Sequence, residues 1–166
     1  MNVQVFKEHS ILSLVREIAE NISYPDVEDV VTFSDIQSIL SDLDALVLCL
    51  PLTAQSRNLI TNGDLIKLKH GAILVNVARE GIIDYSGIVE GIKEGRLAGA
   101  ALDVFNKEPL KRWNRLWGID NLLITPHLSA LTSDYKMRVA DFICDNISRF
   151  VSDRPLRNIV DRAKGY

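Results

Sequence analysis

The sequence has few of the features that mark membrane, secreted or nucleic-acid-binding proteins. No stretch reaches the roughly 18 consecutive apolar residues that a membrane helix needs. The first ten residues hold neither a long apolar run nor a cleavage site of small residues. Lysine and arginine are scattered along a chain of net charge -3, which leaves no basic face for a phosphate backbone. We therefore expect a cytoplasmic protein with no nucleic-acid or membrane partner.

Cysteine is also scarce, with two residues in the chain. Cys49 lies inside the apolar run ALVLCL and Cys144 inside a helical pattern. We expect two buried, reduced thiols without a chemical role, and no metal site. The chain does have 47% hydrophobic and 25% charged residues over 166 positions. This composition is typical of one globular domain with a core, and no repeat or linker divides it.

Short apolar runs alternate with segments of helical period, which is typical of an α/β fold with a parallel sheet and crossover helices. The central runs are almost continuous in Ala, Val, Ile and Leu, so we expect strands covered on both faces. The predicted strands are 3–6, 29–33, 45–50, 72–78, 98–105 and 121–125. The predicted helices are 10–21, 35–43, 63–69, 85–94 and 134–152.

Several helices carry recognisable end signals. Ser34 with Gln37 forms a capping-box pattern, and Asn62 and Asp84 are the predicted N-caps of the next two helices. The last helix carries apolar residues on one face, namely Met137, Ala140, Ile143, Ile147 and Phe150.

Chemically useful side chains follow the strands. The strand at 72–78 leads into Arg79, the strand at 98–105 into the loop with Glu108, and the strand at 121–125 into His127. Parallel strands place their carboxyl ends on one edge of the sheet, where ligands bind in open α/β folds. Each residue alone has an ordinary interpretation, as a solvated arginine, an exposed loop acid or a capped loop imidazole. Their shared edge favours a site for an anionic carbonyl substrate.

The same segments resemble successive blocks of the D-isomer-specific 2-hydroxyacid dehydrogenase family. The blocks are LPLTAQSRNLI, GAILVNVAREGIID, GRLAGAALDVFNKEPL and NLLITPHLSALT, in the family's order, within residues 40–160. The resemblance implies a Rossmann-like fold, with residues 1–166 forming part of the NAD(P)-binding domain. It also implies hydride transfer between NAD or NADP and a small 2-keto or 2-hydroxy acid.

The resemblance assigns a role to each residue at the edge. His127 would be the general acid and base, Glu108 would hydrogen-bond its imidazole, and Arg79 would hold the substrate carboxylate. Asp103 would bind the carboxamide of the nicotinamide. The implied cofactor contacts are Pro51, Thr53, Val77, Ala78, Arg79, Asp103, His127, Ser129 and Ala130.

The sequence also departs from the family. It has no G-x-G-x-x-G loop, whose backbone N–H groups bind the pyrophosphate, and no first strand leading into such a loop. The start MNVQVF resembles the family's second strand. Removing a central strand exposes two unpaired edges, so we expect either a rearranged sheet or an intimate homodimer.

Two further departures concern single charges. Glu80 stands where the family has glycine, and its carboxylate either faces the site or points to solvent. Lys7 stands where NAD-preferring members carry an acid, which favours NADP unless the adjacent Glu8 fills that place. Our leading hypothesis is a truncated or incomplete oxidoreductase of this family. The alternative is a non-catalytic binding or regulatory protein that retains the fold.

Overall fold

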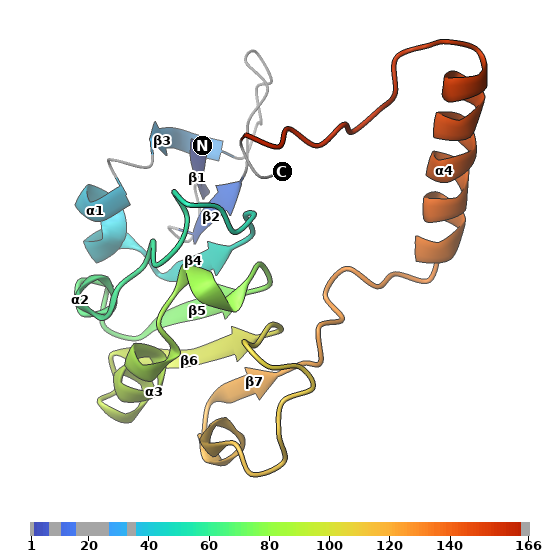
Figure 1. The fold of residues 1–166 in the computed structure, drawn as a ribbon. Coiled ribbons are helices and arrows are strands. Elements are labelled where there is room, and N and C mark those ends of the chain that lie inside the picture. The colour runs from blue at the N-terminus through green and yellow to red at the C-terminus, as the bar shows by residue number, and fades with distance from the viewer. Residues whose placement is uncertain (1, 7–10, 16–26, 33–35, 164–166) are drawn as a thin grey trace. The chain divides into compact units, whose positions relative to one another are not determined.

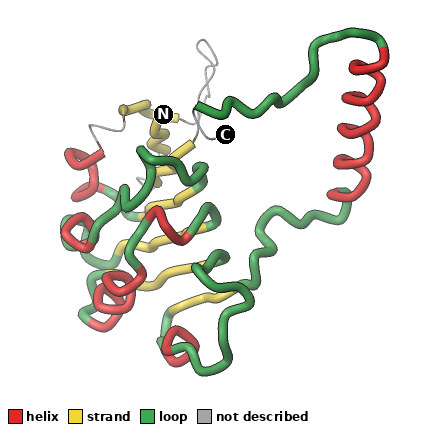
Figure 2. The backbone as a smooth tube through the Cα atoms, viewed as in Figure 1, coloured by secondary structure: helices red, strands yellow, loops and turns green. Residues whose placement is uncertain are grey.

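The computed structural model describes residues 2–6, 11–15, 27–32 and 36–163. The chain divides into two compact units, Met1–His127 and Leu128–Tyr166. Figure 2 shows that strands and helices alternate along most of the first unit, whereas the second unit holds a single long helix. Whether 1–166 forms one partial dinucleotide-binding domain stays a prediction.

The first unit is built on a seven-stranded sheet in the order β3-β1-β2-β4-β5-β6-β7 (Figure 1). The predicted parallel sheet is confirmed for its last four strands, which pair as neighbours in chain order. Each is shorter than its apolar run, because the chain leaves the sheet before the run ends. These strands are β4 (Ala45–Leu48), β5 (Ala72–Asn76), β6 (Leu97–Leu102) and β7 (Leu122–Ile124).

The amino-terminal strands rearrange the sheet. They are β1 (Asn2–Phe6), β2 (Ile11–Val15) and β3 (Val27–Thr32). β2 pairs in parallel with β4, and β1 runs antiparallel between β2 and β3. The predicted helix at 10–21 is therefore wrong over β2, because pairing satisfies the edge of β4 and outweighs helical periodicity. The sheet is rearranged, which is one of the two expected outcomes, and the homodimer stays a prediction.

Short helices follow the strands. They are α1 (Ile36–Ile39), η2 (Leu40–Asp42), α2 (Asn62–Leu65), η3 (Glu80–Ile82), α3 (Tyr85–Lys93) and η4 (Arg115–Gly118). Side chains cap the N-termini of α2, α3 and η4. The side chain of Asp84 accepts from Ser86 N–H and caps α3 as predicted. The cap of α2 is Thr61 rather than Asn62, because Thr61 and Asp64 form a reciprocal capping box. Ser34, Lys7 and Glu8 lie outside the described residues.

One face of the sheet is packed against helices α1, α2 and α3 (Figure 1). Alternate residues of β4 and β5, such as Leu46 and Leu74, are fully buried on this face. On the opposite face Ile73 is 49% exposed and Leu123 is 61% exposed. The three described α-helices of the first unit thus pack on one face of its sheet, and whether helices cover both faces stays a prediction.

The two cysteines are free and exposed, so the prediction of buried thiols is wrong. Cys49 immediately follows β4, and its neighbours Leu48 and Leu50 are the buried members of that run. The alternation of the strand therefore turns Cys49 outward. Cys144 lies on α4 (Tyr135–Val151), a helix with no buried residue.

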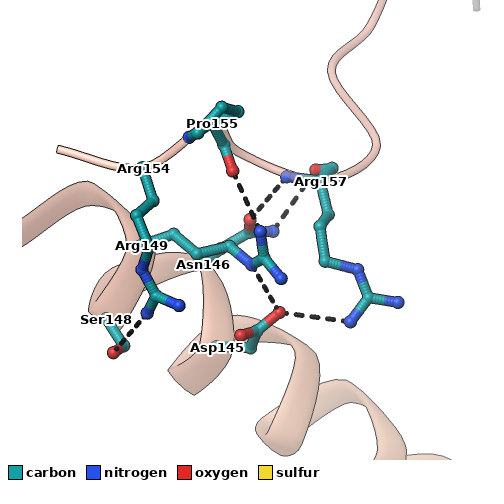
Figure 3. A network of polar contacts seen from close by, with 7 residues as sticks. All are labelled: Asp145, Asn146, Ser148, Arg149, Arg154, Pro155 and Arg157. Atoms are coloured by element: carbon teal, nitrogen blue, oxygen red, sulfur yellow. Dashed lines mark hydrogen bonds and ion pairs between the residues drawn. The ribbon is translucent and has the colours of Figure 1, made fainter. Parts of the chain in front are cut away.

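The second unit consists of α4 and a segment that folds back on it. Asp145 accepts hydrogen bonds from Arg149 and Arg157 at 2.9 and 3.1 Å. Asn146 accepts from the N–H of Arg157 at 2.9 Å, which ties the segment to the helix (Figure 3). The apolar face of α4 is exposed, as Phe150 at 76% shows. No helix among the described residues is long and apolar enough to cross a bilayer.

Candidate functional site

Three of the predicted site residues follow neighbouring parallel strands of the first unit. Arg79 comes just after β5, Glu108 lies in the loop after β6, and His127 comes just after β7. Because β5, β6 and β7 run parallel and pair in that order, their carboxyl ends share one edge of the sheet (Figure 1). The backbone topology therefore agrees with the predicted rim.

Glu108 and His127 are in direct contact at this rim. Nδ1 of His127 lies 2.8 Å from Oε2 of Glu108, and the N–H of Phe105 donates to Oε1 of Glu108 at 2.8 Å. The hydrogen bond with His127, followed by that from Phe105, lowers the pKa of Glu108 below its ordinary value. The carboxylate is therefore charged at neutral pH and orients the imidazole. The two side chains are 36% and 43% exposed, so a ligand can reach them.

The backbone of His127 adopts a left-handed conformation, with φ of 55°. Such a conformation costs a residue other than glycine on the order of 1 kcal/mol, and it persists where the surroundings enforce it. Here the strand β7 precedes the residue and the contact with Glu108 fixes its side chain. Strain of this kind gathers at functional sites, which supports a chemical role for His127.

Arg79 lies on a turn that a buried asparagine holds in place. Asn76 is fully buried, accepts from the N–H of Ala78 at 3.0 Å and donates to the carbonyl of Arg79 at 3.1 Å. The Arg79 guanidinium donates to the carbonyl of Ala78 at 2.7 Å and is exposed. Among the described residues no hydrogen bond or ion pair joins Arg79 to Glu108 or His127. The structure thus brings two of the three catalytic candidates into contact.

A cavity of about 310 Å³ opens beside the histidine. Its polar end is formed by Glu108 and His127, and Trp117 contributes an indole whose N–H donates to the carbonyl of Lys111. The remaining wall is largely apolar, and consists of Phe105, Pro109, Leu110, Ile124, Thr125 and Pro126. A small carbonyl compound in this cavity would lie within reach of a proton donor.

The predicted cofactor residues after β4 are engaged in the structure of their own loop. Thr53 Oγ1 accepts from the N–H groups of Gln55 and Ser56, both at 3.2 Å. Ser56 is fully buried and donates to the carbonyl of Pro51 at 2.7 Å. These bonds account for the polar groups of Pro51 and Thr53 without a ligand.

The cofactor residues predicted after β5 and β6 lie deeper. Val77 donates its N–H to the carbonyl of Leu48 at 3.2 Å, and Ala78 is buried. Asp103 is 3% exposed and accepts from the hydroxyl of Thr125 at 2.5 Å. A buried carboxylate at the carboxyl end of a strand is consistent with the predicted ligand role, and the threonine supplies the partner that burial requires.

The other predicted cofactor residues, Ser129 and Ala130, lie in the second unit and stay predictions. Glu80 is half-buried, and burial, followed by the charge of Asp84, raises its pKa above the ordinary value. His70 is exposed. Within the described part of the chain, no group of three or more His, Cys, Asp or Glu is placed to hold a metal ion.

Sequence reasoning missed two residues that shape the rim, Asn76 and Tyr85. Besides its bonds to the Arg79 turn, Asn76 donates to the hydroxyl of Tyr85 at 3.1 Å. Tyr85 in turn donates to the carbonyl of Val104 at 2.6 Å. The sequence does contain a signal for Asn76, which is the polar residue that ends the apolar strand AILVN. A buried amide at such a place needs hydrogen-bond partners. Nothing in the sequence around Tyr85 indicates its partner.

Comparison with known proteins gives a consistent result. The model of the D-isomer specific 2-hydroxyacid dehydrogenase NAD binding domain matches residues 12–129. A D-3-phosphoglycerate dehydrogenase of Archaeoglobus fulgidus is 38% identical over 76% of this chain and 24% of its own length. A glycerate dehydrogenase of Methylorubrum extorquens is 36% identical over 76% of this chain and 41% of its own length. The chain thus spans well under half of the length of these curated relatives.

A solved structure extends the likeness to the fold. It is the NADPH-dependent glyoxylate/hydroxypyruvate reductase of Sinorhizobium meliloti, crystallised in complex with NADP and sulfate. Its TM-score to this chain is 0.72 at 33% sequence identity, covering 80% of this chain and 43% of the other. The parallel part of the sheet and its flanking helices therefore have a Rossmann-like α/β architecture.

Proposed function

This chain belongs to the D-isomer specific 2-hydroxyacid dehydrogenase family, and on that premise we propose that it serves hydride transfer between a nicotinamide cofactor and a small 2-keto or 2-hydroxy acid. The observation that carries the proposal is the 2.8 Å contact between the His127 imidazole and the Glu108 carboxylate. The names of the matched proteins make glyoxylate, hydroxypyruvate and glycerate the first substrates to test.

The geometry supports a division of labour between the residues at the rim. Nδ1 of His127 faces Glu108, so Nε2 is the nitrogen left for the substrate. From Nε2 the imidazole would protonate the ketone oxygen during reduction and accept the hydroxyl proton during oxidation. A guanidinium has five N–H donors, so the bond from Arg79 to the carbonyl of Ala78 leaves others for a substrate carboxylate.

The rim fits the nicotinamide half of the cofactor better than its diphosphate. A carboxylate has about four acceptor positions, so Asp103 can accept from a carboxamide as well as from Thr125. Ala78 and Val77 would flank the ring. The bound cofactor would supply the hydride, and these residues would position it. The diphosphate has no corresponding match, since the sequence contains no G-x-G-x-x-G loop.

The test begins with cofactor binding. Purified chain is titrated with NADH and with NADPH while nicotinamide fluorescence is followed, and reduction of glyoxylate and hydroxypyruvate is then measured by absorbance. We expect fluorescence to change with either cofactor. No change at millimolar cofactor, together with no turnover, would refute catalysis by this chain.

A matched pair of variants then tests the histidine. His127→Asn suits the left-handed backbone, because asparagine tolerates that conformation. It should abolish turnover with a modest effect on cofactor binding, whereas His70→Asn, at an exposed position, should leave both unchanged. Full activity in His127→Asn would show that the imidazole is not the acid and base.

The alternative, a binding or regulatory protein that retains the fold, is favoured by one observation. The strand beside β4 is β2, which pairs antiparallel with β1. It is not a first strand that leads into a glycine-rich loop for the cofactor's pyrophosphate. A folded chain that binds neither cofactor would support this alternative.

The cytoplasmic location, the lack of nucleic-acid and membrane partners, and the homodimer stay predictions. Light scattering tests the homodimer.

A further inference from the structure

Tyr85 lies between the two halves of the candidate site. It is the first residue of α3, and its hydroxyl accepts from Asn76 at 3.1 Å and donates to the carbonyl of Val104 at 2.6 Å. Asn76 also holds the Arg79 carbonyl at 3.1 Å. One hydroxyl therefore joins the turn that carries Arg79 to the chain that leaves β6.

A second set of contacts connects Tyr85 with the candidate catalytic pair, Glu108 and His127. The rings of Tyr85 and Phe105 pack edge to face, with centroids 6.2 Å apart and an interplanar angle of 85°. The N–H of Phe105 donates to Glu108 at 2.8 Å, and Glu108 contacts His127 at 2.8 Å. The peptide between Val104 and Phe105 is thus held from one side by Tyr85 and from the other by Glu108.

The hydroxyl of Tyr85 remains a donor throughout the working pH range. Burial outweighs the hydrogen bond from Asn76 and, with the charges of Glu80, Glu108 and Asp103, raises the pKa of Tyr85 far above its ordinary value. A phenylalanine at this position would keep the ring contact and lose both hydrogen bonds. Tyr85→Phe therefore separates the hydroxyl's role from packing.

We propose that Tyr85 is a positioning residue that couples the Arg79 turn to the Glu108–His127 pair by fixing the peptide between Val104 and Phe105. The proposal rests on the proposed function, since it gives Tyr85 the task of setting the distance between the substrate's carboxylate and the proton donor. Tyr85 does not touch the reacting atoms and acts through the backbone that holds Glu108.

The test measures the titration of the Glu108 carboxyl directly and needs neither cofactor nor turnover. Chain carrying ¹³C-labelled glutamate carboxyls is titrated by NMR as wild type, as Tyr85→Phe and as Tyr135→Phe. The pKa of Glu108 lies below its ordinary value because of its hydrogen bonds with His127 and Phe105, which outweigh the opposing effects of desolvation and of the charge of Asp103. We expect Tyr85→Phe to move the midpoint of the Glu108 titration to higher pH. Tyr135→Phe, at an exposed position of α4, should leave that midpoint unchanged.

A purely structural role would lower the thermal midpoint of Tyr85→Phe and leave the titration of Glu108 unchanged, and that result would overturn the proposal. If Tyr85→Phe does not fold, the coupling is measured from its other end, because coupling between two sites is reciprocal. Glu108→Gln should then shift the Cζ resonance of Tyr85 and not that of Tyr135. An unmoved Tyr85 resonance would overturn the proposal. A shifted Glu108 in a chain that binds no cofactor would instead leave the coupling standing and refute the proposed function.

Discussion

Replacing Asn76 should lower the free energy of unfolding much more than the loss of a single side chain suggests. The residue is fully buried and its side chain makes three hydrogen bonds, to the N–H of Ala78, the carbonyl of Arg79 and the hydroxyl of Tyr85. In Asn76→Ala the Arg79 carbonyl can turn to water, because that residue is exposed. Tyr85 keeps its bond to Val104. The N–H of buried Ala78 has no such substitute.

The magnitude follows from the group left without a partner. A buried N–H that loses its acceptor costs about 1–3 kcal/mol, and the space vacated by the amide adds about 1 kcal/mol. We therefore expect Asn76→Ala to lower the free energy of unfolding by about 2–4 kcal/mol, measured by urea denaturation followed by circular dichroism. The slope with urea should be unchanged if the fold is retained.

Asn106→Ala provides the matched control. Asn106 is exposed in the loop between β6 and Glu108, and surface substitutions of this kind usually change stability by no more than about 0.5 kcal/mol. If Asn76→Ala cost no more than Asn106→Ala, the Ala78 N–H would have found another partner. The view that Asn76 maintains the Arg79 turn would then be refuted.

Two further predictions concern close packing and pH. Gly99→Ala should destabilise the chain by about 1–3 kcal/mol, because its Cβ would lie 2.8 Å from the carbonyl oxygen of Asn121. Gly118→Ala, whose Cβ would meet nothing within 4 Å, is the control, and equal urea midpoints would contradict the close approach. Burial alone would raise the pKa of Asp64, but hydrogen bonds, above all from Thr61, hold it below its ordinary value. Its stabilisation is therefore present above the unfolded-state pKa and lost as pH falls through the folded-state pKa. In Asp64→Asn the free energy of unfolding should therefore fall less steeply as the pH is lowered. An unchanged pH dependence would contradict this assignment.

The sequence predicted best those elements whose own composition carries the signal. The apolar run at 45–50 became β4 (Ala45–Leu48), and the segment at 85–94 became α3 (Tyr85–Lys93) with the expected cap at Asp84. Strands covered by helices are continuous in apolar residues, and a capped amphipathic helix repeats with its own period. Their ends shifted by one or two residues, because turns rather than composition set them.

The elements that sequence missed depend on partners distant in the chain. The segment ILSLV reads as part of a helix, yet it forms β2 because the edge of β4 is available to pair with it. Cys49 reads as buried because its neighbours are apolar, yet it lies on the side of the chain that Leu48 and Leu50 do not occupy. Pairing with β4 decides the first outcome, and the alternation of side chains along an extended segment decides the second.

The candidate site divides in the same way. That Arg79, Glu108 and His127 follow three neighbouring strands could be predicted, because chain order and parallel pairing fix the rim. Their mutual distances could not, because these depend on loop backbone that no strand pattern specifies. The structure supplies those restraints through Asn76 and Tyr85, neither of which has a candidate role in chemistry. A rim built in this way keeps its candidate catalytic side chains exposed for ligand, while its buried amide and phenol hold the loops in place. Loss of geometry at the rim should therefore arise from buried polar substitutions as readily as from changes to the reactive residues themselves.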